Sequence, residues 1–244
     1  MTNIIGKFKK TLRIKTEILG IFYSAKLQIK SKKFRDTACT ALARSFFTKE
    51  TLFFHTKEYP QLCSGASYFL KLAPISDQET IDVYISKEKV FKSKNICDKF
   101  LKNLPKFPES LKNKFIIIKP ITDKDKPSVV VLLVNPAQAG RILGLINHDR
   151  YEKVEILPSQ PTCLVFFTPL VTKKPHINFL DYYDRYYQGK INGKSIWPED
   201  KMIISMSYSD FETVLANLEK SPHGSFRPNL LPQKISKFYR KNRG

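Results

Sequence analysis

Two uninterrupted apolar runs stand out in the middle of the chain. Residues 115–118 and 129–134 are rich in β-branched side chains, and a polar turn at 122–126 separates them. Runs of this length and composition are typical of strands buried on both faces. The second run is followed closely by Pro136, and the apolar spacing after this proline predicts a helix that reaches Ile146. Strand, tight turn and helix together indicate an α/β unit.

The rest of the pattern predicts shorter elements. Alternation over 22–29 predicts a half-buried strand, and three- and four-residue spacings after Asp36, a suitable N-cap, predict a helix through Phe47. Further strands are expected at 51–55, 81–85 and 202–206, further helices at 64–70, 96–101, 211–218 and 230–240, and a buried helix or strand at 161–170. The pattern as a whole predicts an α/β or α+β fold in which helices flank a mixed sheet.

A short internal similarity suggests two related halves. Residues 59–63 end in a cysteine before an aromatic-rich segment, and residues 159–163 do the same. Positive charge is a second feature of the organisation, because it gathers outside the middle of the chain. We therefore expect a basic N-terminal extension at 1–16, a single domain at 17–230 and a basic C-terminal tail at 231–244.

The formal net charge is +20, which raises nucleic acid or an anionic surface as a partner. Residues 1–35 carry +9 of it and residues 220–244 carry +7, which leaves only +4 for residues 36–219. Binding of this kind would therefore use the two ends. Lys outnumbers Arg, and Lys is a solvated point charge, so a compositional bias without any recognition is the plainer interpretation.

Composition also bounds the class of protein. Hydrophobic residues make up 42% of the chain, yet no apolar run approaches the roughly 20 residues needed to cross a bilayer. The first residues are basic and carry no secretory signal. The four cysteines are widely spaced, unlike the dense framework of a small disulfide-rich domain. We therefore expect a cytoplasmic protein with reduced thiols.

Several short segments, in their order and spacing, resemble the uncharacterised family called domain of unknown function 169. These segments are Ala38-Cys39, 62–66 with 68–70, 134–139, Cys163, Leu180-Asp181 with Arg185, and Ser225-Phe226. The resemblance extends from about residue 17 to residue 230, and it implies a fold class without an activity. The chain departs from the family pattern at Ala66 and Lys71, where members often carry glycine, so a binding loop there is expected to differ.

Three of the four cysteines, Cys39, Cys63 and Cys163, fall within the segments that carry the resemblance, and Cys97 does not. Three thiolates could hold an iron–sulfur cluster with one open iron, or another soft metal. No CxxC pair supports this, and a free cysteine is commonly just a small buried hydrophobe. Both interpretations stay open, and they differ in whether the three sulfurs converge.

The same segments supply five candidate ligand-binding residues: Gly65, Asn135, Gln138, Asp181 and Arg185. Asn135 and Gln138 follow a central strand, where open α/β sheets place ligands and a helix start can bind an anion. Asp181 and Arg185 are four residues apart and could form an ordinary ion pair, or the guanidinium could meet an anionic or planar ligand. No phosphate-binding loop, HExxH motif or nucleophile elbow is present.

The sequence therefore predicts a pocket for a small ligand, cofactor or metal, formed by the Cys39, Cys63, Asn135 and Cys163 segments. The alternative is a protein that binds nucleic acid or an anionic surface through its basic ends. The residues name no reaction and no oligomeric state.

Overall fold

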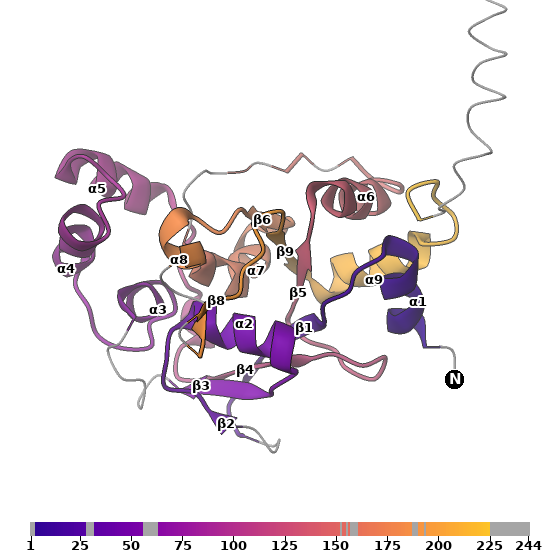
Figure 1. Ribbon diagram of the computed structural model, residues 1–244, viewed down its shortest axis with the longest axis horizontal. Coiled ribbons are helices and arrows are strands. Elements are labelled where there is room, and N and C mark those ends of the chain that lie inside the picture. The colour runs from indigo at the N-terminus through magenta and orange to yellow at the C-terminus, as the bar shows by residue number, and fades with distance from the viewer. Residues whose placement is uncertain are drawn as a thin grey trace, which may run out of the picture.

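A computed structural model describes residues 3–27, 32–55, 63–151, 153–154, 156, 161–186, 190–192 and 194–224. Within these ranges a seven-stranded sheet forms the centre of the molecule, in the order β2-β3-β4-β1-β5-β9-β6 (Figure 1). Its strands are β1 (Ile18–Ser24), β2 (Lys32–Lys33), β3 (Leu52–His55), β4 (Phe115–Pro120), β5 (Val129–Val134), β6 (His176–Asn178) and β9 (Met202–Ser207). Neighbouring strands are antiparallel except for β2 and β3, which are parallel.

Helices pack around this sheet. The α-helices are α1 (Ile4–Leu12), α2 (Ala38–Thr48), α3 (Ser64–Phe69), α4 (Asp77–Asp82), α5 (Lys94–Asn103), α6 (Pro136–Ile146), α7 (Thr168–Thr172), α8 (Tyr182–Tyr186) and α9 (Tyr208–Asn217). A π-helix η1 (Val83–Lys87), the 3-10 helices η2 (Glu109–Leu111) and η3 (Thr162–Phe166), and a ribbon of β7 (Lys190–Ile191) with β8 (Lys194–Ser195) complete the described elements. The expected mixed α/β fold is confirmed.

Strand β5 explains why one stretch of sequence is apolar without interruption. Val129, Val131 and Leu133 belong to one hydrophobic cluster, whereas Val130, Leu132 and Val134 belong to a second cluster. Successive side chains of a strand point to opposite faces, so a strand covered on both faces needs an apolar residue at every position. The first cluster also contains residues of α2, α3, α5 and η3, and the second contains residues of α1, α6 and α9.

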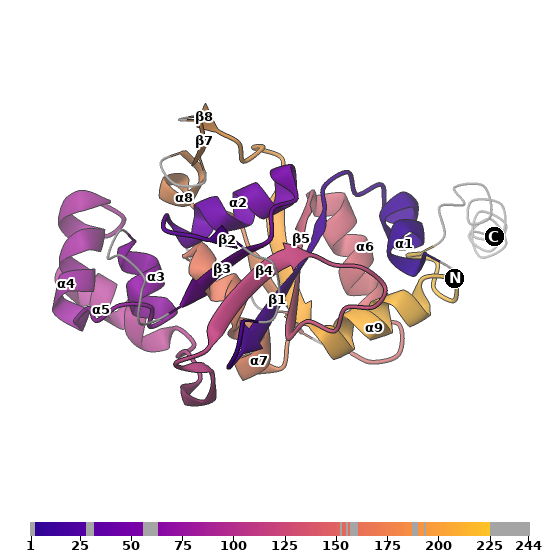
Figure 2. The same cartoon turned by 90° about the horizontal axis from the view of Figure 1, so that it is seen from below.

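The two clusters place different helices at the two ends of the molecule. Helices α3, α4 and α5 lie together at one end, and α1, α6 and α9 lie together at the other (Figure 2). Helix α1 is part of this second group, because Phe8 is fully buried and packs edge-to-face on Phe211 of α9, with ring centroids 5.4 Å apart. Residues within the segment expected as a basic extension thus pack into the core.

Most of the elements expected from the pattern are confirmed near their expected bounds. The strand expected at 22–29 is the displaced one, since it begins at Ile18 and ends at Ser24. The strand expected at 81–85 is wrong, because α4 and η1 occupy these residues. Ser76 and Glu79 form a capping box that starts a helix here, and this helix buries Ile81. The helix expected at 230–240 lies outside the described residues.

Membrane insertion through a helix finds no support in the described ranges, where none of the helices has the length and apolar character that a bilayer span requires.

Candidate functional site

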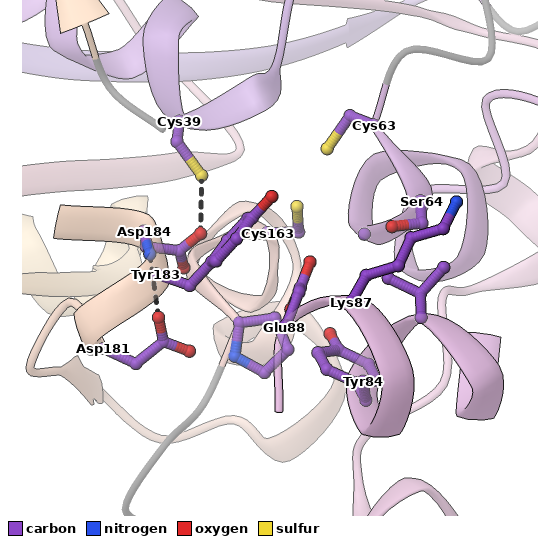
Figure 3. A pocket seen from close by; sticks show the side chains of 13 residues that line it. Cys39, Cys63, Ser64, Tyr84, Lys87, Glu88, Cys163, Asp181, Tyr183 and Asp184 are labelled. Atoms are coloured by element: carbon purple, nitrogen blue, oxygen red, sulfur yellow. Dashed lines mark hydrogen bonds between the residues drawn. The ribbon is translucent and has the colours of Figure 1, made fainter. Parts of the chain in front are cut away.

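Cys39, Cys63 and Cys163 line one pocket of about 240 Å³, although they come from three distant parts of the chain. Figure 3 shows the three sulfur atoms facing the same space. The remaining lining residues are Ser64, Gly65, Val83, Tyr84, Lys87, Glu88, Pro161, Asp181, Tyr183 and Asp184. The pocket thus combines thiols with three carboxyl groups, and α2, α3, η1, η3 and α8 contribute to its wall.

Cys39 is held in place at the start of α2. Thr37 caps this helix by accepting a hydrogen bond from the backbone N–H of Thr40, so that Cys39 is the second helical residue. The buried Cys39 thiol donates to Oδ1 of Asp184 at 3.1 Å. A hydrogen bond with Cys163 lowers the pKa of Cys39, but burial and the charge of Asp184 outweigh it, so the net pKa is raised.

Asp184 connects two of the cysteine-bearing elements. Its Oδ2 accepts hydrogen bonds from the backbone N–H of Thr162 at 2.7 Å and from the Thr162 hydroxyl at 2.6 Å. Thr162 begins η3, the helix that carries Cys163. Burial raises the pKa of Asp184, while the hydrogen bonds from Thr162 and Cys39 act in the opposite direction. One carboxyl group therefore fixes the positions of Cys39 and Cys163 together.

Cys63 is the N-cap of α3, and its sulfur accepts a hydrogen bond from the backbone N–H of Ala66 at 3.3 Å. Hydrogen bonds from the Cys163 thiol and from backbone N–H groups favour the thiolate and lower the pKa of Cys63, in spite of burial. The pKa of Cys163 is raised, first by its hydrogen bonds with Cys39 and Cys63 and then by burial. The three thiols thus interact with one another, and Cys163 lies between the other two.

Two more carboxyl groups face this sulfur cluster with raised pKa values. Burial, together with the charge of Asp184, raises the pKa of Asp181 to about 7. Burial and the charges of Asp184 and Asp181 raise the pKa of Glu88 to about 8. Lys87, on the π-helix η1, is the cation of this wall. Asp181 and Glu88 therefore keep their protons more readily, first because they are buried and then because Asp184 is close by.

A preformed metal site is not present among these side chains. Within the described ranges, no group of three or more His, Cys, Asp or Glu side chains is arranged so that it could hold a metal ion as it stands. The four cysteines are also free thiols rather than disulfides.

Asn135 and Gln138 lie elsewhere, in the wall of a different pocket at the start of α6. Gln138 and Asn135 form a reciprocal capping box, with bonds of 2.8 and 2.9 Å. The Gln138 amide also donates to the backbone carbonyls of Leu12 and Arg13, so it joins the end of α1 to the start of α6. The structure therefore does not bring these two residues to the cysteines.

Gly65 and Asp181 do lie at the cysteines, as parts of the same wall. Arg185 is buried, and its guanidinium donates to the backbone carbonyls of Pro198, Phe179 and Lys201. These contacts connect α8 to the chain before β9. Asp181 instead accepts from the backbone N–H of Asp184 at 2.8 Å.

Sequence reasoning missed Asp184, Glu88 and Tyr84. Asp184 lies three residues after Asp181, and this spacing, which brings two side chains together on a helix, was the available signal. Glu88 follows η1, where the pattern indicated a strand, so nothing in the sequence pointed to its position in the pocket.

Comparison with known protein families shows to which family the chain belongs. The model of domain of unknown function 169, described as an uncharacterised ArCR family, matches residues 7–217. The chain belongs to this family. The match includes all three cysteines of the pocket and most of α1, and it begins ten residues before the predicted domain start. Neither a curated protein nor a solved structure matches the chain. Membership in domain of unknown function 169 therefore brings no activity with it.

Proposed function

We propose that this protein binds a thiolate-coordinated metal centre, either a single soft ion or an iron–sulfur cluster, with Cys39, Cys63 and Cys163 as ligands. The observation that carries the proposal is the convergence of these three cysteines on one pocket from three separate elements. Thiolates favour zinc, copper(I) and iron–sulfur clusters over hard cations.

Cys97 shows what a cysteine with only a packing role looks like in this chain. It is fully buried on α5 within the first hydrophobic cluster, and it does not line the pocket of the other three. Burial raises its pKa to about 11, as expected for a small apolar side chain in a core. The contrast with Cys39, Cys63 and Cys163 supports a different role for them.

The electrostatics of the pocket favour a cation. Asp181, Asp184 and Glu88 all have raised pKa values, and each of them is affected by burial in the same small space. A bound cation stabilises nearby thiolates and carboxylates, so it would replace the protons that these groups otherwise hold. Metal binding should therefore release protons.

Some rearrangement of side chains is part of the proposal, because the cysteines do not surround one point. Cys63 is the candidate to move, since it is half-buried whereas Cys39 and Cys163 are buried. The three sulfur atoms would have to move less to bind an iron–sulfur cluster than to bind a single ion. In a cluster each thiolate binds a separate iron, so the sulfurs do not have to meet at one point. Asp184 is positioned to act as an oxygen ligand beside Cys39.

The test is to produce the full-length protein under anaerobic conditions with iron supplied, and separately with zinc. Iron, zinc and acid-labile sulfide are then measured per chain, and a visible absorption spectrum is recorded. Variants C39A, C63A and C163A should each lose most of the metal. C97A is the matched control, because it removes a buried cysteine outside the pocket and should keep the metal content of the wild type.

A folded, metal-free wild-type protein under both conditions would remove the proposal. So would equal metal loss in C97A and C163A, because that result would reflect general destabilisation.

Binding of nucleic acid or an anionic surface through the basic ends is the alternative, and the described residues give it little specific support. Lys7 pairs with Glu219, and Lys9 lies 3.2 Å from Glu17, so these two charges of α1 are compensated. Residues 225–244 lie outside the described ranges.

A further inference from the structure

We propose a second binding site, for the phosphate group of a small molecule, in the pocket between the end of α1 and the start of α6. This pocket has a volume of about 570 Å³, within the range of small-molecule sites. It is lined by Leu12, Arg13, Lys15, Thr16, Leu133, Asn135, Ala137, Gln138, Arg141, Pro198, Asp200 and Lys201. The thiol pocket shares none of these residues, so the two sites are separate.

Cationic side chains outnumber acidic ones in the wall. Arg13, Lys15, Arg141 and Lys201 face one acidic residue, Asp200, so the formal charge of the lining is +3. Asp200 lies 3.4 Å from Lys201 and offsets the charge of that lysine, so the +3 corresponds to Arg13, Lys15 and Arg141. An isolated carboxylate carries less charge than this wall can balance, whereas a phosphate group at neutral pH carries up to two negative charges. Arginine also matches phosphate oxygens with two parallel N–H bonds.

Two of the cations are close enough to repel each other. Burial and the positive charge of Arg13 lower the pKa of Arg141. The Arg141 guanidinium donates to the backbone carbonyls of Thr11, His223 and Gly224, at 3.1, 2.7 and 3.4 Å. These three bonds fix the orientation of the guanidinium. An anion between the two arginines would relieve the repulsion.

The rest of the pocket is held rigid by contacts that a ligand does not need to break. Gln138 joins α1 to α6 through the carbonyls of Leu12 and Arg13, and Thr16 donates to the carbonyl of Leu133 at 3.3 Å. Arg13 itself is exposed at the end of α1, in the left-handed conformation with φ of 58°. Its side chain lines the pocket and is not part of the core.

Isothermal titration of the full chain, in phosphate-free buffer of low salt, tests this site with inorganic phosphate and with ADP. We expect both to bind. The variant R13Q should weaken the binding about tenfold, which corresponds to the loss of one charge-assisted contact. K173Q is the matched control, because Lys173 is also an exposed cation that ends a helix in the left-handed conformation, with φ of 58°. It should bind as the wild type does.

ADP that binds more tightly than inorganic phosphate would support a ligand that fills the pocket beyond its phosphate group, and equal affinities would support a site for phosphate alone. The proposal fails if neither probe binds the wild type. It also fails if R13Q and K173Q weaken binding equally, because net charge rather than the pocket would then attract the anion. A single-stranded oligonucleotide that binds where both small probes do not would likewise overturn it.

Discussion

The Cys39 thiol donates a hydrogen bond to Asp184 over 3.1 Å, across a separation of 145 residues in the sequence. The same carboxyl group accepts two hydrogen bonds from Thr162, which begins the helix carrying Cys163. The relationship between Cys39 and Asp184 thus connects three elements that have no local reason to meet. It is the contact through which the fold determines the positions of two candidate ligands.

Replacement of Asp184 by Asn should destabilise the protein. An amide presents one accepting oxygen and a donor, so its NH2 group would face either Thr162 or Cys39, both of which donate to Asp184. We expect the free energy of unfolding to fall by about 1–3 kcal/mol, the usual cost of an unsatisfied buried group. Urea denaturation measures this. The control D82N removes an exposed carboxylate on α4 that accepts from Gln78, and it should change stability by less than about 0.5 kcal/mol.

Gly65 is a position where we expect a substitution to affect the proposed metal site but not the fold. A methyl group at this position would lie 3.5 Å from Cys163 Sγ and 3.8 Å from Cys63 Sγ, which are ordinary van der Waals distances. The variant G65A should therefore fold, with a helix stabilised by up to about 1 kcal/mol. It should bind less metal, because the methyl group would lie in contact with both sulfurs. Full metal content in G65A would indicate that the ligand does not use this space.

His176 should make the folded protein less stable in acid. Burial lowers its pKa to about 4, and its Nε2 atom has no hydrogen-bond partner among the described residues. The unfolded chain takes up this proton near pH 6.5, so the unfolded state binds more protons and stability falls as the pH drops from about 6.5 towards 4. Between pH 7 and pH 5 the wild type should lose about 2 kcal/mol more than H176F.

Denaturation curves of both proteins at the two pH values measure this difference. Parallel losses would show that His176 is not the group responsible.

Glu88 should have the opposite pH dependence. Its pKa is raised to about 8, so between the ordinary value near 4.5 and pH 8 the folded state binds more protons than the unfolded state. Stability from this group is present at low pH and is lost as the pH rises towards 8. Because the side chain is half-buried, solvent screening reduces the effect, and we expect E88Q to lose about 1–2 kcal/mol less than the wild type between pH 6 and pH 8.5.

Guanidinium denaturation of metal-free protein is the appropriate measurement. In metal-loaded wild type the same loss should be smaller, because a cation offsets the charge of Glu88. An unchanged slope in E88Q would assign the pH dependence to other groups.

The local pattern of hydrophobic residues predicted the central strands of the sheet well. Residues 129–134 are apolar at every position because β5 is covered on both faces, and that requirement is visible in any window of the sequence. The error at 81–85 has a local cause as well. Ile81, Val83 and Ile85 alternate as in a strand, but the capping box at Ser76 starts a helix first, and this helix continues as η1.

The site was harder to predict because its residues are far apart in the sequence and meet only in the folded chain. The family resemblance singled out the three cysteines, but Asp184 and Glu88 join them only when α8 packs against α2 and η3 and when the residues around η1 form another part of the same wall. Asn135, like the cysteines, belongs to the segments that carry the family resemblance. It lies at the end of β5, however, and this end meets α1 and α6 instead of the cysteines. Order along the sequence could not separate these two pockets.

X-ray absorption at the metal edge of the loaded, full-length protein tests the central claim most directly. The account predicts a shell of sulfur neighbours at about 2.3 Å, typical of metal–thiolate bonds, and a smaller sulfur shell in C39A, C63A and C163A but not in C97A. A shell of only nitrogen and oxygen neighbours in the wild type, or a sulfur shell that none of the three variants reduces, would contradict it.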